Sequence, residues 1–219
     1  MRNRLDHQLL SLHDSLIHMG TLCEEGISAG VEALLTGNTG IARHAIQCEK
    51  DIDQCERDIE SLCMKLLLQQ QPVARDLRAI SSALKMISDM ERIGDQAADI
   101  AEIISHLGAT ELPVTDHIGE MAQAAAKMVT DSVESFVKKD LNLAQGVIQY
   151  DDVVDRGFSA VRNELIDLLR SSNSAASNAL DLLMIAKYLE RIGDHAVNIA
   201  QWVIYAITGE YHKPQHPGA

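Results

Sequence analysis

The stretch ERIGDQAADIAE, residues 91–102, returns as ERIGDHAVNIAQ at residues 190–201. Both copies keep Glu, Arg, Ile, Gly and Asp in one order, and the second begins 99 residues after the first. Apolar or small residues recur through each copy in steps of four and three, as at Met90, Ile93 and Ala97. Such spacing is the heptad seam of helices that pack in a left-handed bundle. The two stretches therefore predict two equivalent amphipathic helices.

The repeat extends well beyond these twelve residues. The apolar seam of residues 79–107 recurs 99 residues later, and the seam of residues 41–66 recurs 102 residues later with Glu164 as its polar exception. The offset changes near QQQP, residues 69–72, where the first half holds three extra residues. Three residues inserted within a helix would rotate its seam by most of a turn, so the change belongs in a loop. The pattern predicts a duplicated unit.

The composition agrees with a helical protein. Of the 219 residues, 46% are hydrophobic but only 3% are aromatic, which is typical of helices packed on helices. Breaks in the pattern separate six segments long enough for multi-turn helices. We expect an all-α fold of six long helices, built as two tandem, pseudo-symmetric three-helix bundles packed side by side. The expected units are a first repeat at residues 1–110, a second at residues 111–208 and a C-terminal tail at residues 209–219.

Charge and composition disfavour several classes of protein. The formal net charge is −13 and no run of five Lys or Arg occurs, so nucleic-acid binding is not expected. No apolar run approaches the ~20 residues that cross a bilayer, and the first residues lack a signal peptide's apolar core. We expect a cytoplasmic protein without membrane insertion. The four cysteines form no C-x-x-C pair, and Cys48 and Cys55 lie at seam positions, which indicates small core residues.

Carboxylates form a stripe opposite the seam of residues 79–107. At about 100° per residue, Glu91, Asp95, Asp99 and Glu102 share one side of the helix. The second copy has Glu190, Asp194, Asn198 and Gln201 at these positions, so we expect all of them to face outward. The preceding segments carry further pairs, 49 with 53 and 151 with 155.

These stacked carboxylates indicate a metal or docking site. Like charges four residues apart on a helix cost about 0.2–0.5 kcal/mol per pair, which a bound cation would offset. Carboxylate ligation favours hard ions. The candidate metal ligands are Glu49, Asp53, Glu91, Asp95, Asp99, Asp151, Asp155, Glu190, Asp194 and Asn198. A solvated acidic face is the alternative interpretation.

The glycine and the arginine of each ERIGD motif lie next to these carboxylates in the sequence. A glycine within a helix costs about 1 kcal/mol relative to alanine, so we expect another backbone to approach Gly94 and Gly193. Arg92 and Arg191 point about 100° away from the preceding Glu, and we expect each to pair with a neighbouring helix.

Two phrases carry a resemblance to a known family. DMERIGDQAADIAEII, residues 89–104, and YLERIGDHAVNIAQWV, residues 188–203, resemble the PhoU family of phosphate-specific transport system accessory proteins. The resemblance covers essentially the whole chain. It includes DLRAISSALKMISD and NALDLLMIAKY before the two phrases, and the acidic starts EKDID and DDVVD.

The resemblance implies a regulator and not an enzyme. Proteins of this family negatively regulate phosphate uptake and the phosphate-starvation regulon. They act with the ATPase subunit of the phosphate ABC transporter and with a PAS-containing sensor histidine kinase. We expect such an adaptor here, as a homodimer.

The resemblance also implies metal at E(D)-x-x-x-D motifs, which bind metal in some members as multinuclear clusters on the surface and have been seen without metal in others. The ion expected here is iron, zinc, manganese or magnesium. The matching pairs are Glu91/Asp95 and Glu190/Asp194, extended by Asp99, with Glu49/Asp53 and Asp151/Asp155 on adjoining helices. The second copy departs from the acidic pattern at Asn198 and Gln201. We therefore expect the first site to hold metal more tightly.

Two other classes remain as alternatives. A carboxylate-bridged metalloenzyme of the ferritin-like type needs Glu-x-x-His motifs aimed into a bundle core. No Glu-x-x-His occurs in this sequence, and the candidate carboxylates are expected to face outward. The other alternative is a metal-free structural dimer.

Overall fold

The computed structural model describes residues 2–70, 72–107, 116–171 and 176–211 of the chain. Within these ranges the regular secondary structure consists of α-helices, which confirms the predicted all-α class. The helices are α1 (Arg2–Thr36), α2 (Thr39–Gln70), α3 (Ala74–Leu107), α4 (Asp116–Lys138), α5 (Leu141–Ser171) and α6 (Ala176–Thr208). The boundary expected between residues 110 and 111 lies outside the described residues. Across the parts of the chain that are described, none of the helices is both long and apolar enough to cross a membrane.

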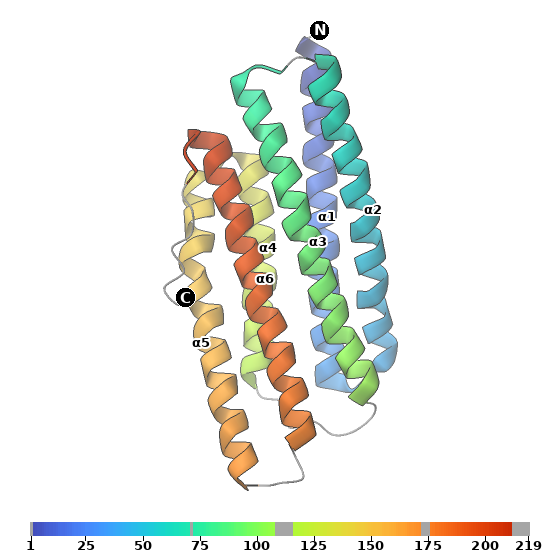
Figure 1. Ribbon diagram of the computed structural model, residues 1–219, viewed down its shortest axis with the longest axis vertical. Coiled ribbons are helices and arrows are strands. Elements are labelled where there is room, and N and C mark those ends of the chain that lie inside the picture. The colour runs from blue at the N-terminus through green and yellow to red at the C-terminus, as the bar shows by residue number, and fades with distance from the viewer. Residues whose placement is uncertain (1, 71, 108–115, 172–175, 212–219) are drawn as a thin grey trace.

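The helices form two three-helix bundles that lie side by side, as predicted (Figure 1). Helices α1, α2 and α3 contact one another, and so do α4, α5 and α6. The bundles meet through α3 against α6 and α1 against α4, which leaves α2 and α5 on the two outer sides. In Figure 1, α3 runs downward and α6 upward, so the equivalent helices of the two repeats pack antiparallel.

The apolar seams form the core that the periodicity predicts. Met86, Met90 and Ile93 of α3 are fully buried, as are their equivalents Ile185, Leu189 and Ile192 of α6. In α5 the polar exception of the seam, Glu164, lies half-buried beside His117 of α4, with 2.7 Å between Oε1 and Nδ1. At this position the seam accommodates a carboxylate that has a polar side chain as its neighbour.

The short connections between the first two helices of each repeat are also equivalent. Gly37, after α1, has a φ of 68°, and Lys139, after α4, has a φ of 55°. The next residue caps the following helix in both repeats: the Asn38 carboxamide oxygen accepts from the Gly40 N–H, and the Asp140 carboxylate accepts from two N–H groups of α5. The duplication thus preserves the turn even where glycine has been replaced.

The glycine of each ERIGD motif lets a side chain from the preceding helix approach closely. A Cβ added to Gly94 would lie 2.9 Å from Cδ1 of Ile52 on α2. A Cβ on Gly193 would lie 3.1 Å from Oδ1 of Asp151 and 3.6 Å from Val154, the equivalent of Ile52. The expectation that another backbone approaches these glycines is therefore wrong, because side chains occupy the space. The contact brings α2 close to α3, and α5 close to α6, beside the acidic residues.

We predict that Gly94→Ala destabilises the fold by about 1 kcal/mol. Overpacking against the buried Ile52 costs about 1–3 kcal/mol, which exceeds the gain of about 1 kcal/mol in helix propensity. Urea unfolding followed by circular dichroism measures the change. Adding Ile52→Val, which removes the clashing Cδ1, should recover part of the loss.

Gly146→Ala is the matched control, because Gly146 lies within α5 with no heavy atom within 4 Å of an added Cβ. That variant should gain up to about 1 kcal/mol from helix propensity alone. Equal stabilisation by Gly94→Ala would show that the Ile52 contact is not tight.

Candidate functional site

The predicted carboxylates of the first repeat lie together where α2 packs against α3. Glu49 and Asp53 come from α2, and Glu91 and Asp95 from α3; we call these four residues the first acidic cluster. Burial raises the pKa of Glu49, and the charges of Asp53 and Asp95 raise it further. Burial and Asp95 likewise raise the pKa of Glu91. The two helices therefore bring these side chains within electrostatic reach of one another.

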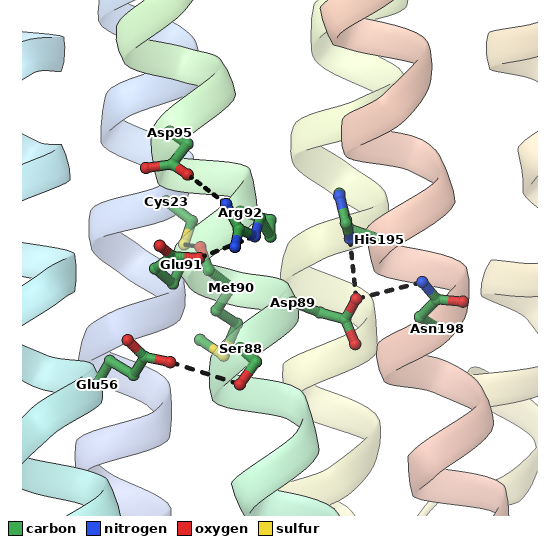
Figure 2. A network of polar contacts seen from close by, with 10 residues as sticks. All are labelled: Cys23, Glu56, Ser88, Asp89, Met90, Glu91, Arg92, Asp95, His195 and Asn198. Atoms are coloured by element: carbon green, nitrogen blue, oxygen red, sulfur yellow. Dashed lines mark hydrogen bonds and ion pairs between the residues drawn. The ribbon is translucent and has the colours of Figure 1, made fainter.

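Arginines of the same two helices partly neutralise the first acidic cluster. Arg92 Nε lies 3.3 Å from Glu91 Oε2, and its Nη1 lies 3.1 Å from Asp95 Oδ2 (Figure 2). Arg57 of α2 pairs with Asp53 at 3.6 Å. Arg92 thus pairs within α3, and the expectation that it pairs with a neighbouring helix is wrong. The charge of Arg191 on α6 opposes the rise in the pKa of Asp99 on α3, and its pairing with a neighbouring helix stays a prediction.

The second acidic cluster occupies the equivalent place between α5 and α6. It consists of Asp151 and Asp155 from α5 and Glu190 and Asp194 from α6. Burial raises the pKa of Asp151 to about 6, and Asp155, Asp194 and Glu190 add to the rise. Lys187 forms an ion pair with Glu190. Asp151 is also the side chain that fills the space beside Gly193, which explains why it is the more buried carboxylate of the pair.

The remaining candidate ligands, Asp99 and Asn198, lie where α3 meets α6. The Tyr188 hydroxyl of α6 donates a hydrogen bond to the Asp99 carboxylate, but burial, together with the charges of Glu102 and Asp95, raises the pKa of Asp99. Asn198 Nδ2 donates to Asp89 Oδ1 at 3.2 Å. Both residues therefore bridge the two repeats at the margins of the clusters.

Asp89 and His195 form a contact that the sequence did not single out. His195 Nδ1 lies 2.8 Å from Asp89 Oδ1, and both side chains are mostly buried (Figure 2). Figure 2 shows Asp89 on the side of α3 that faces α6, away from Glu91 and Asp95. The duplication relates Asp89 to Tyr188 and Asp99 to Asn198. Asp89 contacts Asn198, and Tyr188 contacts Asp99, so the two contacts are equivalent. This correspondence was the signal in the sequence that could have indicated the contact.

Gln201 departs from the predicted outward stripe. Its side chain is buried, with a relative exposure of 7%, whereas its equivalent Glu102 is exposed. A neutral amide costs far less to bury than a carboxylate, so Gln201 can lie buried at this position of α6. Gln201 therefore belongs to the packing of the second repeat and not to an outward-facing acidic site.

The chemistry of both clusters fits a hard cation. Each cluster places four partly exposed carboxylates on two adjoining helices, so an ion would have access from solvent. Among the described residues, no three of these carboxylates bring oxygen atoms within 4.8 Å of one another, so binding an ion would require their side chains to move closer together. Glu49, Asp53, Glu91 and Asp95 would hold it in one repeat, and Asp151, Asp155, Glu190 and Asp194 in the other. The ion would supply positive charge that neutralises the carboxylates of the cluster. Among the described residues, the buried polar side chains of the core are neutral.

These features define a class of protein before any relative is considered: a duplicated helical protein with a carboxylate cluster on each repeat. The sequence model of the PhoU domain matches the chain twice, at residues 16–104 and 118–203. A phosphate-specific transport system accessory protein PhoU homolog from Clostridium acetobutylicum is 35% identical, covering 95% of this chain and 96% of its own. The chain belongs to the PhoU family.

Solved structures agree with this assignment. The crystal structure of PhoU from Pseudomonas aeruginosa superposes with a TM-score of 0.88 at 35% identity, covering 94% of this chain and 99% of that chain. The phosphate transport system regulatory protein PhoU from Streptococcus pneumoniae has a TM-score of 0.88 at 28% identity, covering 96% of this chain and 100% of that chain. The predicted family and fold class are both confirmed.

We predict that Asp151→Asn stabilises the metal-free protein at pH 7–8 by about 1 kcal/mol. Because the pKa of Asp151 is raised to about 6 in the folded state, the folded protein binds more protons than the unfolded chain between about pH 4 and 6. Its ionisation therefore lowers stability as the pH rises through 6, and partial exposure reduces the full effect. Urea unfolding of chelator-treated protein at several pH values measures the difference.

The gain should vanish below about pH 4, where the carboxyl is protonated in both states. Asp14→Asn is the control, since it removes one carboxylate from an exposed position of α1. A gain that is independent of pH, or equal in the control, would contradict the assigned origin of the effect.

Proposed function

We propose that this protein is a cytoplasmic negative regulator of phosphate uptake and of the phosphate-starvation regulon. It acts as an adaptor between the ATPase subunit of a phosphate ABC transporter and a PAS-containing sensor histidine kinase, and it forms a homodimer. The observation that carries the proposal is the match of both repeats to the PhoU domain, because relatives over nearly the whole length are named accessory proteins of phosphate-specific transport. Such coupling requires different affinities for the active and resting states of a partner.

The placement of the acidic clusters supports a regulatory surface. Helices α3 and α6 lie in front of α1 and α4 in Figure 1, with α2 and α5 flanking them. The α2–α3 and α5–α6 junctions therefore border the same central pair of helices. Bound metal would organise these junctions or screen their charge for a partner. The proposed ions are iron, zinc, manganese or magnesium.

Exposed apolar side chains at two helical hairpins offer contacts for partners. At the α2–α3 hairpin, Leu68 and Val73 are 77% and 69% exposed. At the α5–α6 hairpin, Leu180 is 62% exposed. The two hairpins lie at opposite ends of the molecule (Figure 1), so two partners can bind without competing for one surface. This separation suits an adaptor that holds a transporter subunit and a kinase.

We predict that the two acidic clusters bind metal independently. Asp95→Asn should remove the metal of the first repeat and Asp194→Asn that of the second, and the double variant should lose both. Equilibrium dialysis against manganese or iron, followed by elemental analysis, measures the occupancy. Asp14→Asn is the matched control, with one carboxylate lost outside the clusters.

Unchanged metal content in the double variant would refute the assigned ligands and favour a metal-free dimer. The same samples are tested for oxidation of ferrous iron. Turnover would support a ferritin-like metalloenzyme, although the carboxylates of both clusters lie outside the buried core.

We predict that deletion of the gene raises a phosphate-starvation reporter in ample phosphate and that the wild-type protein restores repression. Pull-down should recover the transporter ATPase and the kinase with the wild-type protein, and recovery should depend on phosphate. Leu68→Glu should weaken capture of at least one partner, because it places a charge in an apolar contact.

Leu35→Glu is the control, since Leu35 is 57% exposed at the end of α1, away from the α2–α3 hairpin. Normal reporter activity in the deletion strain, or no phosphate-dependent capture of either partner, would refute the proposed function. Light scattering of the purified protein tests the dimer.

A further inference from the structure

Three different potential ligands meet between α1 and α2, and none of them belongs to the carboxylate pairs. A carboxylate oxygen of Glu25, a ring nitrogen of His44 and Sγ of Cys48 all lie within 4.8 Å of one another. His44 Nε2 is 3.9 Å from Cys48 Sγ. Glu25 and His44 are exposed, while Cys48 is buried with a relative exposure of 1%. The cluster thus joins a buried thiol to two groups at the surface.

Local structure explains why these three side chains converge. His44 and Cys48 are four residues apart on α2, so they occupy the same side of the helix on successive turns. Helix α1 passes close to this turn, because a Cβ added to Gly26 would lie 3.5 Å from Cβ of Cys48. That approach places the neighbouring Glu25 beside the thiol. Glu25 and Cys48 are therefore held together by the packing of the first repeat.

The second repeat preserves the geometry but not the chemistry. An offset of 102 residues relates Glu25, His44 and Cys48 to Lys127, Gly146 and Tyr150. There, Lys127 Nζ lies over the Tyr150 ring, 5.7 Å from its centroid. The equivalent positions are thus neighbours in both repeats, but only the first supplies metal ligands. The cluster is a feature of the first repeat alone and shares no residue with either acidic cluster.

We propose that Glu25, His44 and Cys48 form a site for a borderline-soft divalent cation of the zinc class. Thiolate, imidazole and carboxylate are the ligand types that Zn²⁺ takes, whereas the hard ions suited to carboxylate clusters avoid sulfur. Bond lengths of about 2.0–2.3 Å place tetrahedral ligand atoms roughly 3.3–3.6 Å apart. The ligand atoms now lie within 4.8 Å of one another, so the exposed Glu25 and His44 side chains would rotate towards Cys48 Sγ on binding. Water fills the fourth position on the solvent side.

The test uses Co²⁺ as a spectroscopic probe in the full-length, reduced, metal-free protein. Cobalt should bind at one equivalent with a thiolate-to-metal charge-transfer absorption, and Zn²⁺ should displace it. His44→Ala and Glu25→Gln should each weaken binding by about tenfold or more, since even residues that only support metal ligands contribute about 10–100-fold. Both positions are exposed, so these variants should fold. Cys48→Ser should abolish the absorption.

Matched controls separate this site from other thiols and from the carboxylates. Cys55→Ser changes a half-buried cysteine of the same helix, and His18→Ala removes an exposed histidine of α1; neither should alter the signal. His44→Cys, which keeps a ligand, should retain binding. A missing charge-transfer band, or full binding in both His44→Ala and Glu25→Gln, would overturn the proposal. Carboxylate ligation gives no thiolate band, so binding at the acidic clusters cannot imitate the result.

Discussion

A close contact at the ERIGD glycine, between α2 and α3 in the first repeat and between α5 and α6 in the second, determines where the acidic residues meet. Ile52 packs against Gly94, and its equivalent Val154 packs beside Gly193. A side chain at either glycine would separate the helices at the level where Glu and Asp flank it on both sides. Burial of apolar side chains drives the two helices together, and the absence of a Cβ on the glycine sets the distance between them. The carboxylates converge because the core beneath them requires that spacing.

The interface between the repeats depends on the same helices through a different side of each. Antiparallel packing of α3 and α6 pairs Asp89 with Asn198 and Asp99 with Tyr188, two contacts related by the duplication. His195 joins only the first of these pairs, whereas its equivalent Gln96 is buried with an unpaired side-chain oxygen. Polar contacts at equivalent positions therefore join the two repeats, although the residues that make them have diverged. The acidic clusters are held on either side of this shared interface.

The sequence predicted the helices, the core and the duplication because each follows from periodicity along one chain. Met90 and Ile93 are buried in a seam that repeats at a constant offset. Contacts between repeats could not be predicted in this way. Whether Asp89 meets solvent or His195 depends on how two bundles pack, and the buried Gln201 shows that polarity alone does not decide exposure. Glu25 and Cys48 were missed for the same reason, since they lie on different helices.

Divergence after duplication has given the two acidic clusters different electrostatic character. In the first, Arg57 and Arg92 pair with Asp53, Glu91 and Asp95, so the protein already neutralises part of the charge. In the second, Asp151 is the more deeply placed carboxylate, and four neighbouring carboxylates add to the rise in its pKa. A cation entering the first cluster must displace or tolerate guanidinium groups. A cation entering the second replaces a proton on Asp151 at mildly acidic pH, so competition with protons should be strongest there.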